Sequence, residues 1–229
     1  MSPHSPRLAL AAALSGALLI SPSAGAAPAA VSRTTATVVT HRVDIDGDGR
    51  ADTVTLRLVS SRERNGYRLA VRTATGRSSS QVVYADSFPG APASDLWVGV
   101  TGIDGVRGNE IMLDQNAGIG DFPLLLTYTW RKGKLTLLPA PGGSTRSPGW
   151  SLVFPPFRVS GYSFSMKGST RYVVHHALNP SPSGRTYSGT NTTYRWTAKG
   201  WQRVTTKKSG VVSRATADKM ADLRGLIWR

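Results

Sequence analysis

Four aspartates and two glycines fall within nine residues of the sequence, in the segment 44–52 (DIDGDGRAD). Calcium is a hard cation that takes several oxygen ligands at about 2.3–2.6 Å, and carboxylates at positions 1, 3, 5 and 9 of a loop can converge on it. Gly49, at position 6, allows the tight turn that curls such a loop around an ion. The sequence therefore predicts a calcium site with these ligands: Asp44, Asp46, Asp48, the carbonyl of Arg50, and Asp52.

The alternative interpretation of this segment is an acidic turn that holds no metal. Four carboxylates this close together would repel one another without a cation, so the composition favours calcium. Thr55 stands at position 12, where a helix–loop–helix calcium site has a bidentate glutamate. Because both flanking segments have the pattern of strands, we expect a strand–loop–strand site.

Apolar and polar residues alternate along most of the chain, which is typical of half-buried β-strands. The segments 53–59 (TVTLRLV) and 67–73 (YRLAVRT) show this alternation, and turn residues such as those at 65–66 (NG) separate successive segments. Many short strands punctuated in this way predict an all-β domain, which we place at 37–212.

A helical pattern is confined to the end of the chain. Met220, Leu223 and Ile227 fall on one side of a helix, and Asp218 lies early in the segment, where the helix dipole favours a negative charge. The sequence predicts a short C-terminal helix over 213–229 that covers an edge strand.

The calcium-loop pattern recurs in a weaker form later in the sequence. The segment 44–47 (DIDG) reappears at 102–105 (GIDG), and each copy leads into an apolar strand pattern. In this register Asp104 corresponds to Asp46 and Glu110 corresponds to Asp52. The two copies begin at residues 44 and 102. A repeat with this spacing indicates stacked units that cannot bury their apolar faces alone.

The sequence also indicates a third, fainter unit. Its hairpin at 194–200 resembles the hairpin at 128–133. The units are approximately 37–95, 96–148 and 149–212. Fewer than four blades do not ordinarily close a propeller. We therefore expect repeated antiparallel β-blade units in a propeller-like or open β-repeat arrangement.

These loops resemble those of FG-GAP or VCBS-type repeat proteins, whose β-blades carry DxDGDGxxD calcium loops like those of integrin α-subunit propellers. The resemblance is specific over 44–54 and partial over 102–113. It implies an extracellular β-blade fold, structural calcium, and a role in adhesion or ligand binding. In the second loop, Gly102 and Val106 stand at ligand positions 1 and 5, so we expect that loop to keep its turn and lose the metal.

The later half of the domain is strongly basic. Residues 122–217 contain fourteen Lys or Arg, thirteen of the eighteen aromatic residues, and no Asp or Glu. Cations neutralise a polyanion and aromatic rings stack on sugars or bases. We expect an anionic polymer or cell-wall glycan as the partner, with nucleic acid as an alternative. The expected contact residues are Arg131, Lys132, Lys134, Arg195, Lys199, Arg203, Lys207 and Lys208.

A second interpretation of this half is purely structural. Aromatic residues at every second position commonly form the buried face of a strand, and a basic surface can serve only to keep an exported protein soluble.

The first residues of the chain have the pattern of a secretory signal peptide, with Arg7, an apolar run over 8–20, and small residues before a cleavage point near Ala26. The predicted organisation is a signal peptide over 1–26 and a flexible segment over 27–36. The chain contains no cysteine, so no lipid-attachment site is expected. We expect a protein without a transmembrane segment after cleavage, secreted or associated with the cell envelope.

Catalytic patterns are scarce. The sequence has no GxSxG, P-loop or HExxH motif. A strand would direct the adjacent His175 and His176 to opposite faces, one packed and one exposed. Carboxylates such as Glu110, Asp114 and Asp121 could form a glycosidase-like pair, but their positions are also those of turn residues. We expect a non-catalytic binding or adhesion module; the alternatives are a structural envelope protein without a ligand and an unrecognised secreted hydrolase.

Overall fold

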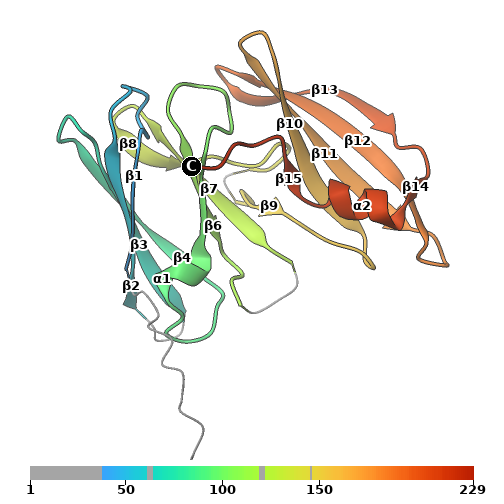
Figure 1. Ribbon diagram of the computed structural model, residues 1–229, viewed down its shortest axis with the longest axis horizontal. Coiled ribbons are helices and arrows are strands. Elements are labelled where there is room, and N and C mark those ends of the chain that lie inside the picture. Colours follow the sequence, from blue (N-terminus) through green and yellow to red (C-terminus); the bar gives the residue numbers. More distant parts are fainter. Residues whose placement is uncertain (1–37, 61–63, 119–121, 145) are drawn as a thin grey trace, which may run out of the picture. The chain divides into compact units, whose positions relative to one another are not determined.

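The computed structural model describes residues 38–60, 64–118, 122–144 and 146–229 (Figure 1). The predicted signal peptide (1–26) and the segment 27–36 lie outside the described residues. The described part contains fifteen strands and two short helices, which confirms the all-β class.

The first sheet is an antiparallel meander with the strand order β1-β2-β3-β4. The strands are β1 (Val38–Val43), β2 (Asp52–Ser60), β3 (Asn65–Arg72) and β4 (Ser78–Ala85). The alternating apolar residues of β2 and β3 are buried on one face, since side chains two residues apart share a face of a strand.

The second sheet is also an antiparallel meander, preceded by the single-turn helix α1 (Ala93–Leu96). Its strands follow the order β5-β6-β7-β8, and β9 pairs with the start of β7. The strands are β5 (Trp97–Thr101), β6 (Glu110–Asp114), β7 (Leu124–Arg131), β8 (Lys134–Leu137) and β9 (Trp150–Ser151).

The third sheet contains the longest strands, in the order β13-β12-β11-β10-β15, with β14 paired to β12. Only the contact of β10 with β15 is parallel. The elements are β10 (Val159–Lys167), β11 (Thr170–Pro180), β12 (Thr186–Thr197), β13 (Gly200–Lys208), β14 (Val212–Ser213), α2 (Arg214–Met220) and β15 (Leu223–Arg224).

Two hydrophobic clusters connect the sheets. One joins the buried residues of β2 and β3 to those of β6 and β7, including Leu56, Leu69 and Ile111. The other surrounds Trp150 and includes Phe164 from β10. Each sheet thus buries its apolar face against a neighbouring sheet. The three sheets, as far as they are described, form no closed barrel or propeller.

The C-terminal helix is shorter than the sequence predicted. Instead of 213–229, α2 spans Arg214–Met220. Ser213 is its N-cap residue, and the Ser213 Oγ accepts a hydrogen bond from the Thr216 N–H. The chain then pairs with β10 through β15, where a positive φ at Gly225 fits against the carbonyl of Phe164. The helix prediction relied on an apolar residue at position 223. Leu223 is apolar because it packs in the cluster around Trp150, not because it lies on a helix face. The helix packs on β10, β12 and β14, the short strand that pairs with β12.

None of the helices among the described residues combines the length and apolar character needed to cross a bilayer.

Candidate functional site

The first loop, residues 44–51, brings three carboxylates together. Oxygen atoms of Asp44, Asp46 and Asp48 all lie within 4.8 Å of one another. Asp44 holds the loop in this shape, because its two oxygens accept hydrogen bonds from the N–H groups of Gly47 (2.7 Å) and Gly49 (2.9 Å). The set offers only oxygen ligands, the kind that a hard divalent cation requires.

Glycine is needed in this loop for both conformation and space. Gly47 and Gly49 have φ values of +83°, which other residues rarely adopt. A Cβ atom on Gly47 would lie 2.7 Å from the backbone carbonyl carbon of Arg107 in the second loop. The two loops also share a hydrogen bond from the Asn109 amide to the carbonyl of Asp44. The first loop is therefore shaped partly by its neighbour.

Asp52 has a different place from the one that the sequence predicted. Its side chain is fully buried, and its Oδ2 atom accepts hydrogen bonds from the N–H groups of Ile45 (2.7 Å) and Asp46 (3.2 Å). Its Oδ1 atom accepts from the N–H of Ala74 at 2.8 Å. The structure thus groups three of the four predicted carboxylate ligands and uses Asp52 to anchor the loop to the sheet. The Arg50 carbonyl stays a predicted ligand.

The neighbouring carboxylates of the first loop affect the ionisation of Asp46. Burial raises the pKa of Asp46, and the carboxylates of Asp52, Asp48 and Asp44 raise it further, against the lowering effect of the Asp48 N–H. A nearby divalent cation would reverse this repulsion.

The second loop, residues 102–109, reproduces the hydrogen bonds of the first. Glu110 Oε2 accepts from the N–H of Ile103 at 2.6 Å, as Asp52 does from Ile45. Asp104 Oδ1 accepts from the N–H of Val106 at 2.8 Å, as Asp46 does from the residue two positions later. Hydrogen bonding therefore pairs Asp104 with Asp46 and Glu110 with Asp52, in the register that the sequence predicted.

An arginine provides the positive charge in the second loop. Arg131 Nη2 lies 2.5 Å from Asp104 Oδ2 and 3.6 Å from Glu110 Oε1. Both carboxylates are buried, and Thr129 donates a further hydrogen bond to Glu110 Oε1 at 2.9 Å. Arg131, which the sequence assigned to a polyanion surface, is thus committed to an internal ion pair.

Burial dominates the ionisation of this cluster. It raises the pKa of Glu110 to about 7, with Asp104 adding to the increase and Arg131 opposing it. Burial also raises the pKa of Asp104 against the same arginine. Arg171, from β11, lies nearby and donates to the carbonyl of Gly102 at 2.9 Å. The charge of Glu110 is therefore sensitive to pH near neutrality.

The third unit has no comparable loop. A turn of two residues, Gly168 and Ser169, connects β10 directly to β11. It offers no carboxylate and leaves no room for a ligand loop.

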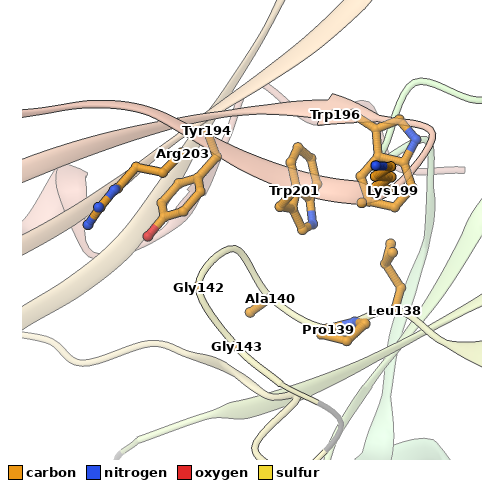
Figure 2. Close-up of a pocket in the computed structure, with 11 residues that line it drawn as sticks. Leu138, Pro139, Ala140, Gly142, Gly143, Tyr194, Trp196, Lys199, Trp201 and Arg203 are labelled. Carbon is orange, nitrogen blue, oxygen red and sulfur yellow. The ribbon is translucent and has the colours of Figure 1, made fainter.

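A groove of about 470 Å³ lies beside the hairpin of β12 and β13. We call it the aromatic groove; Figure 2 shows the segment 138–143 along one wall. The opposite wall carries Tyr194, Trp196, Lys199, Trp201 and Arg203.

Two tryptophan side chains of the groove are half-buried and fixed by packing. Trp196 and Trp201 are paired across the strands, with ring centroids 5.0 Å apart in an edge-to-face arrangement. Trp201 also contacts the fully buried Trp150 at 6.1 Å. Trp150 is therefore a buried core residue, as expected if the aromatic residues serve only the structure. Trp196 and Trp201 belong both to the core and to the groove wall.

The predicted basic residues do not form one surface. Only Lys199 and Arg203 line the aromatic groove. Strand alternation directs Arg195 and Lys207, the partners of Gln202 and Asn191, to the opposite face of the sheet. Lys208 is exposed further along β13. Lys132 and Lys134 belong to the β7–β8 hairpin of the second sheet.

Sequence reasoning missed a hydrogen-bonded chain of three side chains. Ser163 Oγ lies 2.8 Å from His176 Nε2, and His176 Nδ1 lies 2.8 Å from Asn191 Oδ1. These residues come from β10, β11 and β12. The cross-strand register that joins them depends on pairing across turns, which spacing within one strand does not reveal.

The two histidines do occupy opposite faces, but neither is freely exposed. His176 is buried, and His175 is half-buried against Tyr162 and lies 3.1 Å from Ser160 Oγ. Burial lowers the pKa of both histidines.

Two of the three carboxylates considered for a glycosidase-like pair accept hydrogen bonds within the fold. Glu110 bonds Thr129, and Asp114 Oδ1 accepts from the N–H groups of Asn116 and Leu124. Asp121 lies outside the described residues.

No protein-family model, curated protein or solved structure matches the chain.

Proposed function

We propose that the protein is a secreted calcium-binding β-repeat module of the FG-GAP or VCBS type that binds an anionic extracellular polymer without catalysis. The observation that carries this proposal is the aromatic groove, where Trp196 and Trp201 lie beside Lys199 and Arg203. Rings and cations are the groups that an anionic glycan or nucleic acid would use.

One calcium ion in the first loop is part of this proposal. Asp44, Asp46 and Asp48 supply converging oxygens, and the buried Asp52 fixes the backbone that carries them. The second loop would not bind calcium, because Arg131 already neutralises Asp104. The ion would stiffen the loop and the sheet contacts that it supports; it would take no part in a reaction.

The charge distribution supports a polyanion as the partner. The chain carries a net charge of +15, and residues 122–217 contribute fourteen cations without a carboxylate. No acidic residue lines the aromatic groove. A cell-envelope glycan, a teichoic-acid-like polymer and nucleic acid share the required negative charge.

We expect the protein to bind immobilised heparin with an affinity that falls steeply with salt. Each cation that neutralises an anion releases about 0.7–0.9 counterions. The double variant Lys199→Ser/Arg203→Ser should therefore reduce the slope of log affinity against log salt by about 1.5. Equilibrium binding at several salt concentrations measures this slope.

The matched control is Arg195→Ser/Lys207→Ser, which removes the same charge from the opposite face of the sheet. It should leave the slope nearly unchanged. Equal losses in the two double variants would show that only net charge matters. Elution of the wild type together with a neutral protein at low salt would favour the structural alternative, in which the basic surface only maintains solubility.

The chain of Ser163, His176 and Asn191 favours a second candidate, a secreted hydrolase. With His176 Nδ1–H donating to Asn191, the Nε2 atom is free to accept the Ser163 proton, which is how a serine nucleophile is activated. Against this candidate, none of the described cavities is lined by Ser163.

A fluorophosphonate probe separates the two candidates. The binding proposal predicts that the wild-type protein stays unlabelled when its intact mass is measured. A single label that disappears in Ser163→Ala and persists in Ser160→Ala would favour the hydrolase, because Ser160 contacts His175, which has no third hydrogen-bonding partner in the described part of the chain.

A further inference from the structure

We propose that the aromatic groove holds one sugar ring of an acidic polysaccharide, with the acidic groups of the chain at its two ends. This inference rests on the proposed function and specifies its ligand class. It selects carbohydrate over nucleic acid as the polyanion.

The groove has the dimensions of a site for a small ring. Its volume of about 470 Å³ falls within the roughly 300–1,000 Å³ of small-molecule sites. The wall formed by Pro139, Ala140, Gly142 and Gly143 carries no large side chain. Gly142 has no room for one, because a Cβ atom there would lie 2.8 Å from the Tyr194 hydroxyl. The narrow space suits a single ring against one wall.

The opposite wall suits the amphipathic surface of a sugar. The C–H groups of a pyranose ring are apolar and can pack on an indole, while its hydroxyl groups need hydrogen-bond partners. Trp201 is held by Trp150 and Trp196, so little side-chain entropy remains to be lost on binding. Its indole N–H is buried and has no acceptor among the described residues, and the Tyr194 hydroxyl also faces this space.

The aromatic geometry disfavours a single-stranded nucleic acid. Such ligands stack successive bases on successive exposed rings. Here Trp196 and Trp201 are half-buried and inclined by 72° to each other, so they do not form a series of parallel platforms. One ring can stack in the groove, and its neighbours must lie beyond it.

Lys199 and Arg203 lie where the adjacent sugar units would carry their charged groups. Figure 2 shows Tyr194 and Arg203 at one end of the groove, Trp201 in the middle, and Trp196 with Lys199 at the other end. A linear chain with one ring against Trp201 would place carboxylates or sulfates of adjacent units near Arg203 and Lys199. These groups match an acidic polysaccharide running along the groove.

The test compares three ligands of equal length by isothermal titration: a polygalacturonate hexamer, a heparin-derived hexamer and a hexathymidylate. We expect both acidic hexasaccharides to bind at least about tenfold more tightly than hexathymidylate, since the inclined rings of the groove offer successive bases no series of platforms. Preference between the first two distinguishes a carboxylate from a sulfate ligand. The bound sugar should also protect tryptophan fluorescence from acrylamide quenching.

The key variant is Trp196→Ala, which removes the ring that holds Trp201 in position and should weaken hexasaccharide binding about tenfold. Its control is Tyr172→Ala, because Tyr172 lies under Lys167 in the same sheet but outside the groove. If Trp196→Ala alters the melting profile, Tyr194→Phe provides a milder variant that should still weaken the sugar complex.

The sugar assignment would be overturned if hexathymidylate bound as tightly as the hexasaccharides and if Trp196→Ala and Tyr194→Phe bound like the wild type. Polyanion binding would then remain. Absence of binding to all three ligands and to heparin would instead remove the proposed function itself.

Discussion

Replacing Arg131 by methionine is expected to lower the free energy of unfolding by about 3–5 kcal/mol at pH 8. The substitution keeps an unbranched side chain but removes the guanidinium that lies against Asp104 and Glu110. Two buried carboxylates would then face each other with Arg171, which forms no ion pair with either of them, as their remaining positive neighbour. Urea denaturation followed by fluorescence measures the change.

The control is Arg64→Met, which removes an ion pair with Asp86 whose two side chains are about half exposed. Exposed pairs contribute less than about 1 kcal/mol, so this variant should resemble the wild type. Similar losses in the two variants would contradict the internal role of Arg131.

The effect of the Arg131 substitution should depend on pH. The pKa of Glu110 is about 7 in the folded protein, against 4.5 for an unperturbed glutamate, so the folded state binds its proton more tightly. The stabilisation from this proton is complete below pH 4.5 and is lost as pH rises through 7. The variant should therefore be less impaired at pH 5 than at pH 8, and adding Glu110→Gln should remove most of that difference.

Replacing Asp52 by alanine is expected to lower the free energy of unfolding by about 3 kcal/mol or more even in the presence of a chelator. Its carboxylate accepts hydrogen bonds from the N–H groups of Ile45, Asp46 and Ala74. An unsatisfied buried donor costs about 1–3 kcal/mol; Ile45 is buried, and Asp46 and Ala74 are partly buried.

Asp48→Ala provides the matched control, because Asp48 is exposed and accepts only a local hydrogen bond from the Arg50 N–H. Its loss in chelator should be far smaller. A larger loss for Asp48 than for Asp52 would show that the loop is not anchored as described.

The correspondence between the two loops could be predicted because it depends on local spacing. The correspondence of Glu110 with Asp52 follows from two short segments of sequence, and the hydrogen bonds to Ile103 and Ile45 reproduce it. The separation of Asp52 from the other three aspartates could not be predicted in this way. It depends on the N–H of Ala74, which strand pairing brings from 22 residues away.

The partners of Arg131 were hidden for the same reason. A count of charges treats every arginine in a basic segment alike, but this one lies 27 residues from Asp104 in sequence and beside it in the fold. Likewise, Lys207 and Arg203 are close in sequence and lie on opposite faces, since alternation and the bulge between Thr193 and Tyr194 decide their directions. Composition predicted a basic half; the sheet decides which cations can act together.

The number of calcium ions per chain tests the central claim most directly. Isothermal titration of chelator-treated protein should show one ion per chain, with a dissociation constant of about 10⁻⁴–10⁻³ M, as is usual for extracellular loops. Glu110→Gln should keep this stoichiometry and Asp48→Ala should lose it. A wild-type protein that binds no calcium at millimolar concentration, or that binds two ions with equal affinity, would contradict the assignment of a cation to the first loop and an arginine to the second.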